Sequence, residues 1–106
     1  MPKYLIKVTY TPEGARGLLK EGGTARRNVV QKLVEALGGK LEAFYYAFGT
    51  DDAYVITDVP QQTDGLALTL AVNASGAVHL TTTPLILPEE IDAAAKKAVS
   101  YRAPGA

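Results

Sequence analysis

The stretch that most limits what this chain can fold into is Lys40–Phe48, because it is apolar on both of its alternating sides. Read as a strand, it divides its apolar side chains between the two faces of a sheet: Phe44, Tyr46 and Phe48 on one, and Leu41, Ala43, Tyr45 and Ala47 on the other. Helices packed on one side of a sheet bury only one face. We therefore expect the second face to meet another subunit, a bound molecule, or both.

Length and charge narrow the class of protein. A chain of 106 residues supports one domain with its own core, and self-association would add to a modest stability. We expect a single domain over residues 1–102 and a flexible tail over residues 103–106. The 11 basic and 11 acidic side chains cancel, which disfavours nucleic acid and membrane surfaces as partners.

The absence of certain segments adds an expectation about location. The chain has no cysteine, which excludes disulfides and thiolate metal sites. Its N-terminal residues lack the apolar core of a signal peptide, and no stretch reaches the roughly 20 apolar residues that span a bilayer. These features predict a soluble, cytoplasmic protein.

Strand and helix patterns alternate along the chain. The expected elements are a strand over 4–10, a helix from Thr11-Pro12-Glu13 that breaks at Gly22-Gly23 and ends at Gly38-Gly39, strands over 40–48 and 53–57, a helix between Asp64 and Ser75, a strand over 77–83 and a helix from Pro88 onward. In the last helix, we expect one apolar face to point inward: Ile91, Ala94, Ala95, Ala98 and Val99.

This order predicts an α+β fold, the ferredoxin-like split β-α-β-β-α-β with a four-stranded antiparallel sheet and an added C-terminal helix. Both crossover helices lie on one face because such crossovers are right-handed. The bare face is expected to carry Lys7, Thr9, His79, Thr81, Thr83 and the aromatic row Phe44, Tyr46 and Phe48. Burying such a face against a second copy, at about 25 cal/mol per Å², would yield several kcal/mol, so we expect a homodimer.

Polar groups on that face could line a small-molecule site between subunits. The candidate ligand-binding residues are His79, Tyr46, Tyr54, Asp52 and Thr81. His79 is the only histidine and a natural proton carrier near neutral pH, although a lone histidine on a strand is more often a hydrogen-bonded packing residue. No catalytic residue can be assigned.

A metal site is a further possibility at the turn between the strands expected over 40–48 and 53–57. Asp51 and Asp52 could bind a metal with His79, but no spacing supplies three or four converging ligands. Adjacent aspartates in a turn more often accept local backbone hydrogen bonds. We therefore expect neither a metal nor another cofactor.

Arg26 and Arg27 form a separate candidate, for anion binding. They follow Gly22-Gly23-Thr24 at a predicted helix start, where free backbone amides and two cations suit a carboxylate or a phosphate. The alternative is a pair of solvated arginines after a glycine break. The segment is neither a Walker loop nor a dinucleotide fingerprint.

Several blocks in order resemble one known family. They are Thr11-Pro12-Glu13-Gly14, Lys20-Glu21-Gly22-Gly23, Leu37-Gly38-Gly39-Lys40-Leu41-Glu42, Phe48-Gly49 with Asp52, Ala74-Ser75-Gly76-Ala77-Val78 and Pro88-Glu89-Glu90. Together they resemble the GYD domain family of small bacterial proteins, from about Lys3 to Arg102. Gly49 and Asp52 fit the turn that names the family, but Asp51 stands where its tyrosine is expected and Thr50 intervenes.

The resemblance implies a ferredoxin-like protein of the dimeric α+β-barrel type, of uncharacterised function and with no catalytic residue to transfer. Our first hypothesis is a homodimer or higher oligomer that binds a small organic molecule at the open sheet face, as a binding protein or a cofactor-free enzyme. The alternative is a structural or assembly module whose aromatic face serves subunit association alone. A regulatory sensor domain is a third, weaker reading.

Overall fold

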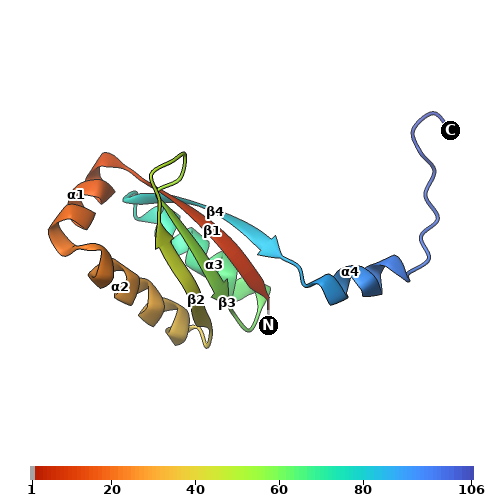
Figure 1. Cartoon of the computed structure of the whole chain (residues 1–106), viewed down its shortest axis with the longest axis horizontal. Coiled ribbons are helices and arrows are strands. Elements are labelled where there is room, and N and C mark those ends of the chain that lie inside the picture. The colour runs from red at the N-terminus through yellow and green to blue at the C-terminus, as the bar shows by residue number, and fades with distance from the viewer. Residues whose placement is uncertain (1) are drawn as a thin grey trace.

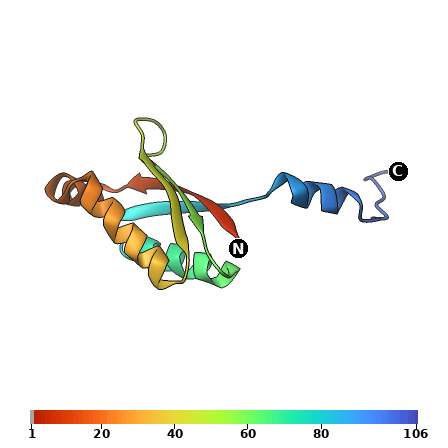
Figure 2. The ribbon, with the colours of Figure 1, turned by 60° about the horizontal axis from the view of Figure 1, so that its bottom comes forward.

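The computed structural model describes residues 2–106, so Met1, the expected start of the domain, lies outside the described residues. In chain order the elements are β1 (Lys3–Tyr10), α1 (Pro12–Glu21), α2 (Gly23–Ala36), β2 (Lys40–Tyr46), β3 (Ala53–Asp58), α3 (Gln62–Ala74), β4 (Val78–Leu85) and α4 (Pro88–Ala95). The four strands form one antiparallel sheet in the order β2-β3-β1-β4 (Figure 1). Helices α2 and α3 lie on the same side of it (Figure 2). The predicted ferredoxin-like α+β fold is confirmed.

The first helical segment begins and breaks as its sequence predicts. The Thr11 Oγ1 caps α1 by accepting a hydrogen bond from the Gly14 N–H at 3.1 Å, and Pro12 occupies the first turn, where no amide partner is needed. Gly22 separates α1 from α2 with a φ of 89°, a backbone angle that side chains disfavour. The Gly22-Gly23 break is therefore a bend between two helices.

The core lies between the sheet and α2 and α3. Among residues 2–106, ten apolar side chains are buried, and they include Tyr4, Ile6 and Val8 of β1 and the fully enclosed Val34 of α2. Helix α3 is held to β4 by Asn73, whose side-chain oxygen accepts from the Leu80 N–H at 2.7 Å. Ten side chains make a small interior for a chain of 106 residues.

The C-terminal helix does not pack as expected. We define the C-terminal arm as residues 86–106; every one of them is exposed, and the expected inward face of α4 was wrong for the single chain. Ile91, the middle of that face, is 57% exposed. The arm continues away from the end of β4 (Figures 1 and 2), and the radius of gyration is 17.1 Å, against about 13 Å for a compact domain of this length. Local periodicity gave α4 an apolar face, but the chain's own body does not cover it.

No helix within residues 2–106 combines the length and the apolar character needed to cross a membrane.

Candidate ligand site on the open sheet face

The sheet face opposite α2 and α3, here called the open face, is organised in rows that run across the strands. In antiparallel pairs, directly opposed residues point to the same side. Lys7 of β1 is opposed by Tyr54 on β3 and by Thr81 on β4, and Tyr54 is opposed by Tyr45 on β2. Tyr45, Tyr54, Lys7 and Thr81 therefore form one row over all four strands, which we call the central row.

The rows on either side of the central row differ in chemistry. On one side lie the mostly apolar Ala43, Ile56, Leu5 and Thr83, again directly opposed. On the other side, His79 of β4 faces Thr9 of β1. Tyr45 is 70% and Tyr54 36% exposed. The open face thus joins an apolar strip to a polar strip, with two tyrosines and a lysine at their boundary.

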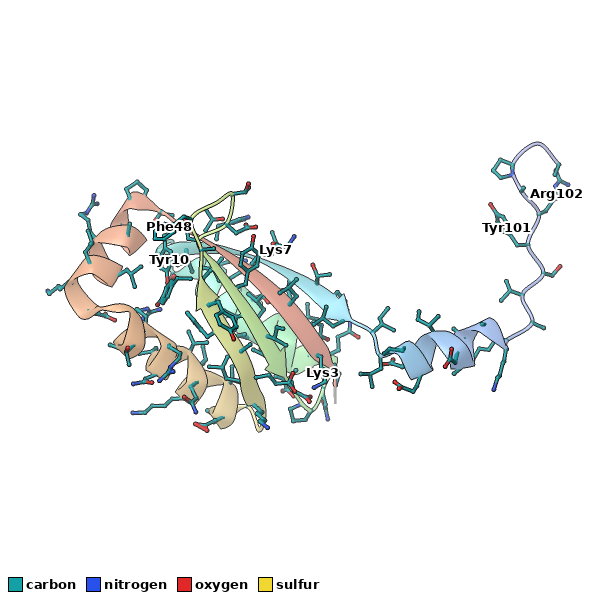
Figure 3. All side chains as sticks on the ribbon, viewed as in Figure 1. Lys3, Lys7, Tyr10, Phe48, Tyr101 and Arg102 are labelled. Atoms are coloured by element: carbon teal, nitrogen blue, oxygen red, sulfur yellow. The ribbon has the colours of Figure 1, made fainter. Side chains whose placement is uncertain are left out.

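Two lysines of β1 point to this face and have different surroundings. Lys3 donates to Glu42, and to Asp58 Oδ2 at 3.1 Å, and these hydrogen bonds raise its pKa, with Glu42 the larger cause. Lys7, four residues along the strand (Figure 3), forms no ion pair with any residue of the described chain, 2–106. The open face therefore presents one neutralised ammonium and one without a counter-charge.

The aromatic row of β2 lies on the other side from the one expected. Phe44 packs against the core beneath the helices, and Tyr46 donates its hydroxyl to the Gly23 carbonyl of α2 at 3.0 Å. The two rings meet edge to face with centroids 5.1 Å apart. Phe48 lies beyond the strand and is fully exposed on the β2–β3 loop. The prediction that these three rings cover the open face was wrong.

The prediction for β2 failed because its sequence fits either face of the sheet. Both of its sides are apolar, so alternation alone does not say which side meets the helices. The pairing of β2 with β3 is irregular between Leu41 and Ala43, which sets Glu42 apart as a bulge. The bulge lets Leu41 and Phe44, three residues apart, both pack against the core, and leaves Tyr45 on the open face.

The ligand-binding candidates consequently divide between the two sides of the sheet. His79, Thr81 and Tyr54 lie together on the open face, whereas Tyr46 lies on the helix side. Asp52, the residue before β3, lies beside the end of β1, where its carboxylate accepts a hydrogen bond from the Tyr10 N–H at 2.8 Å. The backbone N–H of Asp52 also donates to the Val8 carbonyl at 2.7 Å. Asp52 thus ties the β2–β3 loop to β1.

The metal candidates do not come together. Asp51 lies in the β2–β3 loop, within 3.4 Å of the Tyr54 hydroxyl, which donates to it. Within residues 2–106, no three histidine, aspartate or glutamate side chains lie close enough to hold a metal ion.

The two arginines of the anion candidate border different hollows. Arg26 lines the space between α2 and α3 and lies 3.8 Å from the Glu21 carboxylate. Arg27 lines a hollow beside Glu42 and Tyr45, and its guanidinium donates to the Asn28 side chain at 3.3 Å. The structure does not bring the two guanidinium groups to one position.

Arg26, Tyr10 and Tyr46 form a polar cluster where α1 meets α2. Tyr10 is half-buried, and its burial, followed by the neighbouring Tyr46, raises its pKa to about 12, while Arg26 acts in the opposite direction. A tyrosine with a raised pKa is favoured in its neutral form in the folded state. The unfolded chain ionises from about pH 10, so this contribution to stability is present below pH 10 and is lost as the pH rises toward 12.

Tyr10→Phe should therefore remove part of the alkaline loss of stability. We expect the free energy of unfolding of the native chain to fall by about 1 kcal/mol more than that of Tyr10→Phe between roughly pH 10 and 12, after allowance for solvent screening of a half-exposed group. Urea unfolding at a series of pH values measures the free energy of unfolding of both proteins. Taking the difference between them cancels the titration of the lysines, which both proteins share. Parallel curves for the two proteins would contradict the burial of this hydroxyl.

Lys7 and Tyr45 are the two members of the central row that sequence reasoning did not select as site residues. Alternation along residues 4–10 did place Lys7 on the bare face. What was missing was the register, which alone shows that Lys7 is opposed by Tyr54 and Thr81. Tyr45 was not selected because β2 was assigned the wrong way round, which put Tyr45 on the helix side.

Comparison with known proteins gives one result. The model of the GYD domain matches residues 4–95. No curated protein and no solved structure gives a significant match.

Proposed function

The chain belongs to the GYD domain family, whose model matches residues 4–95, and we propose that it is a homo-oligomer that binds a small organic acid between paired open faces. The observation that carries the proposal is the central row, in which Lys7 lies between Tyr54 and Thr81 and forms no ion pair with the part of the chain that the structure describes. The proposal concerns binding, and it assigns no reaction.

Pairing of the faces follows from their apolar content. Tyr45, Tyr54, Ile56 and Leu5 form a continuous surface on three neighbouring strands. Exposed apolar area of this kind marks an association surface. A two-fold pairing is the simplest closed arrangement, because it uses the same surface on both copies. Since β1 and β3 are the inner strands, an axis through the middle of the sheet would bring both copies of Lys7 into one space.

The ligand class follows from the charge of Lys7. Pairing the faces would remove the Lys7 ammonium from water, which is costly unless an anion accompanies it. Lys3 has its own acidic partners, whereas Lys7 forms no ion pair with any of residues 2–106. A carboxylate would supply the counter-charge, with the Thr81 hydroxyl close by as a donor, while the rings of Tyr45 and Tyr54 favour an apolar or aromatic body. His79 lies at the edge of this space, beside Thr9.

The test is binding of benzoate compared with its neutral analogue benzamide. We expect benzoate to raise the melting temperature and benzamide to have little effect, since only benzoate carries the charge. A ligand at a hundred times its dissociation constant adds roughly 2.7 kcal/mol of stability. Lys7→Met should weaken benzoate binding about 10- to 100-fold, the usual range for one charged hydrogen bond, as measured by calorimetry.

Lys3→Met is the matched control, because Lys3 lies on the same strand and the same face but is neutralised by Glu42 and Asp58. It should lower stability without a comparable change in benzoate affinity. Equal losses in the two variants, or no response to benzoate and to a wider series of aliphatic and aromatic carboxylates, would refute the ligand proposal.

The second candidate function is an assembly module without a ligand. It is favoured by the amount of apolar surface outside the open face, including Leu19, Leu70 and the arm residues Ile91 and Val99. In that case the apolar strips of two open faces pack on each other, and the contact leaves Lys7 in solvent. An oligomer that forms normally and binds no carboxylate would support this second function over the first.

A further inference from the structure

Helices α2 and α3 leave an apolar cleft between them, here called the α2–α3 cleft. Its cavity has a volume of about 80 Å³, with Val29, Val30 and Leu33 on the α2 side and Leu68 and Val72 on the α3 side. Val29 and Leu33, one helical turn apart, remain 48% and 37% exposed. Among the described residues that line the cleft, Tyr10 and Arg26 carry the only polar side-chain groups. The cleft is therefore an apolar groove with a cation at one end.

The arm offers a helix of matching character. In α4 and the residue before it, Leu87, Ile91 and Ala94 are spaced at i, i+4 and i+7, which places them on one side of the helix. Leu87 is 48% and Ile91 57% exposed, so this side is uncovered in the single chain. Apolar anchors at this spacing are the usual means by which a helix binds in a groove.

Charge complements the apolar fit. Helix α4 contains Glu89, Glu90 and Asp92 and no basic residue, for a net charge of −3. Helix α2 contains Arg26, Arg27 and Lys32 against Glu35, for a net charge of +2; of these, Arg26 lines the cleft, with Glu21 3.8 Å from its guanidinium. Opposite charge on two surfaces guides their association and fixes their orientation.

The chain's own arm is poorly placed to fill the cleft. Leu85, the last residue of β4, lies opposite Lys3 at the start of β1. The cleft is lined by Val8 and Leu80, which are paired toward the other end of β1. Only two residues, 86 and 87, connect β4 to α4. Helix α3 covers the direct path back, since Thr69 bonds to Thr82 at 2.9 Å and Asn73 bonds to Leu80. Figure 3 shows Tyr101 and Arg102, farther along the arm, well away from the body.

We propose that α4 of one copy docks in the α2–α3 cleft of a second copy, with Leu87 and Ile91 against Val29 and Leu33 and the acidic first turn toward Arg26. A reciprocal exchange would give each copy one donated arm and one filled cleft, which closes the assembly. This contact uses neither the open face nor Lys7. It therefore goes beyond the proposed function, and the two can fail separately.

The native chain lacks cysteine, so single cysteines can map the contact without background. Leu33→Cys and Ile91→Cys are made as two separate full-length chains, mixed, and oxidised. We expect a disulfide joining the two different chains, at several times the yield of either self-pair. Asp92→Cys is the matched control for the arm, because it neighbours Ile91 but points away from the apolar side. Mixed with Leu33→Cys, it should give a clearly lower yield.

Each other outcome overturns the proposal. Predominant Ile91→Cys self-pairs would show that arms bind arms, and an intrachain disulfide in the doubly substituted chain would show that the arm folds back. A yield no higher than that of the Asp92→Cys control would also refute the proposal. The rate at which Leu33→Cys reacts with a thiol reagent would then show what occupies the cleft. A slow reaction would indicate a small molecule there, and a fast reaction an empty cleft. Circular dichroism confirms that each variant is folded.

The charge argument has its own readout in the same assay. Arg26→Glu should lower the yield of the mixed disulfide, more strongly at low than at high salt, because exposed charges are screened by salt. Lys20→Glu, on α1, makes the same change of charge outside the cleft and should have little effect. Equal effects of the two substitutions would contradict docking next to Arg26.

Discussion

Gly14→Ala is expected to lower the free energy of unfolding by about 3 kcal/mol or more, because α1 lies directly on the backbone before β4. Gly14 is buried, and a Cβ at this position would lie 1.8 Å from the carbonyl oxygen of Ala77. That oxygen accepts hydrogen bonds from the Thr11 N–H at 3.1 Å and from the Thr11 hydroxyl at 3.0 Å. The backbone at Ala77 cannot retreat without losing both bonds.

Gly17→Ala is the matched control on the same helix. Apart from its chain neighbours and the backbone of its own helix, no atom of the described residues lies within 4 Å of a Cβ at Gly17, and alanine is the better helix former. It should raise the free energy of unfolding by up to about 1 kcal/mol. Urea unfolding of both variants measures the contrast. Similar stabilities would mean that α1 does not approach Ala77 as closely as the structure has it.

The same substitution at two consecutive residues of β3 should have opposite consequences. Val55 faces the helices and is 2% exposed, so Val55→Asp would bury a carboxylate without a partner. We expect a loss of about 4 kcal/mol or more, enough to unfold a small domain. Ile56 points to the open face, between Ala43 and Leu5. Ile56→Asp should leave the fold intact and weaken self-association about 100-fold or more, because it places a charge in the paired apolar strip.

Circular dichroism and sedimentation velocity separate these two effects. Because exchanged arms could also hold two copies together, Ile91→Asp is added to both chains being compared. A folded Ile56→Asp/Ile91→Asp protein with the same sedimentation coefficient at low concentration as Ile91→Asp alone would refute pairing through the open face. If chains that carry Ile56→Asp still form the disulfide between Leu33→Cys and Ile91→Cys, open-face pairing and arm docking are independent of each other.

Much of the fold could be predicted because its signals are local. The Thr11-Pro12 start, the Gly22-Gly23 break and the alternation along β1 and β4 each depend on a few neighbouring residues, and the structure confirms them. Once the faces of β1 and β4 are fixed, His79 and Thr81 fall on the open face without further information.

The rest depends on relations between distant residues. The face of β2 could not be decided from its own sequence, because both sides are apolar and the irregularity at Glu42 changes the alternation. The central row needed the register of three strand pairs, and for that reason Lys7 was placed on the right face but given no role. In α4, periodicity identified an apolar face, but it could not show that the chain's own body leaves this face exposed.

The small interior has a consequence for how the protein persists at different abundances. A chain that buries ten apolar side chains in its described part retains little stability of its own. If association supplies the remainder, mass action makes the folded fraction depend on how much chain is present. Scarce copies would then be degraded faster than plentiful ones, and the amount synthesised would set the lifetime of each molecule.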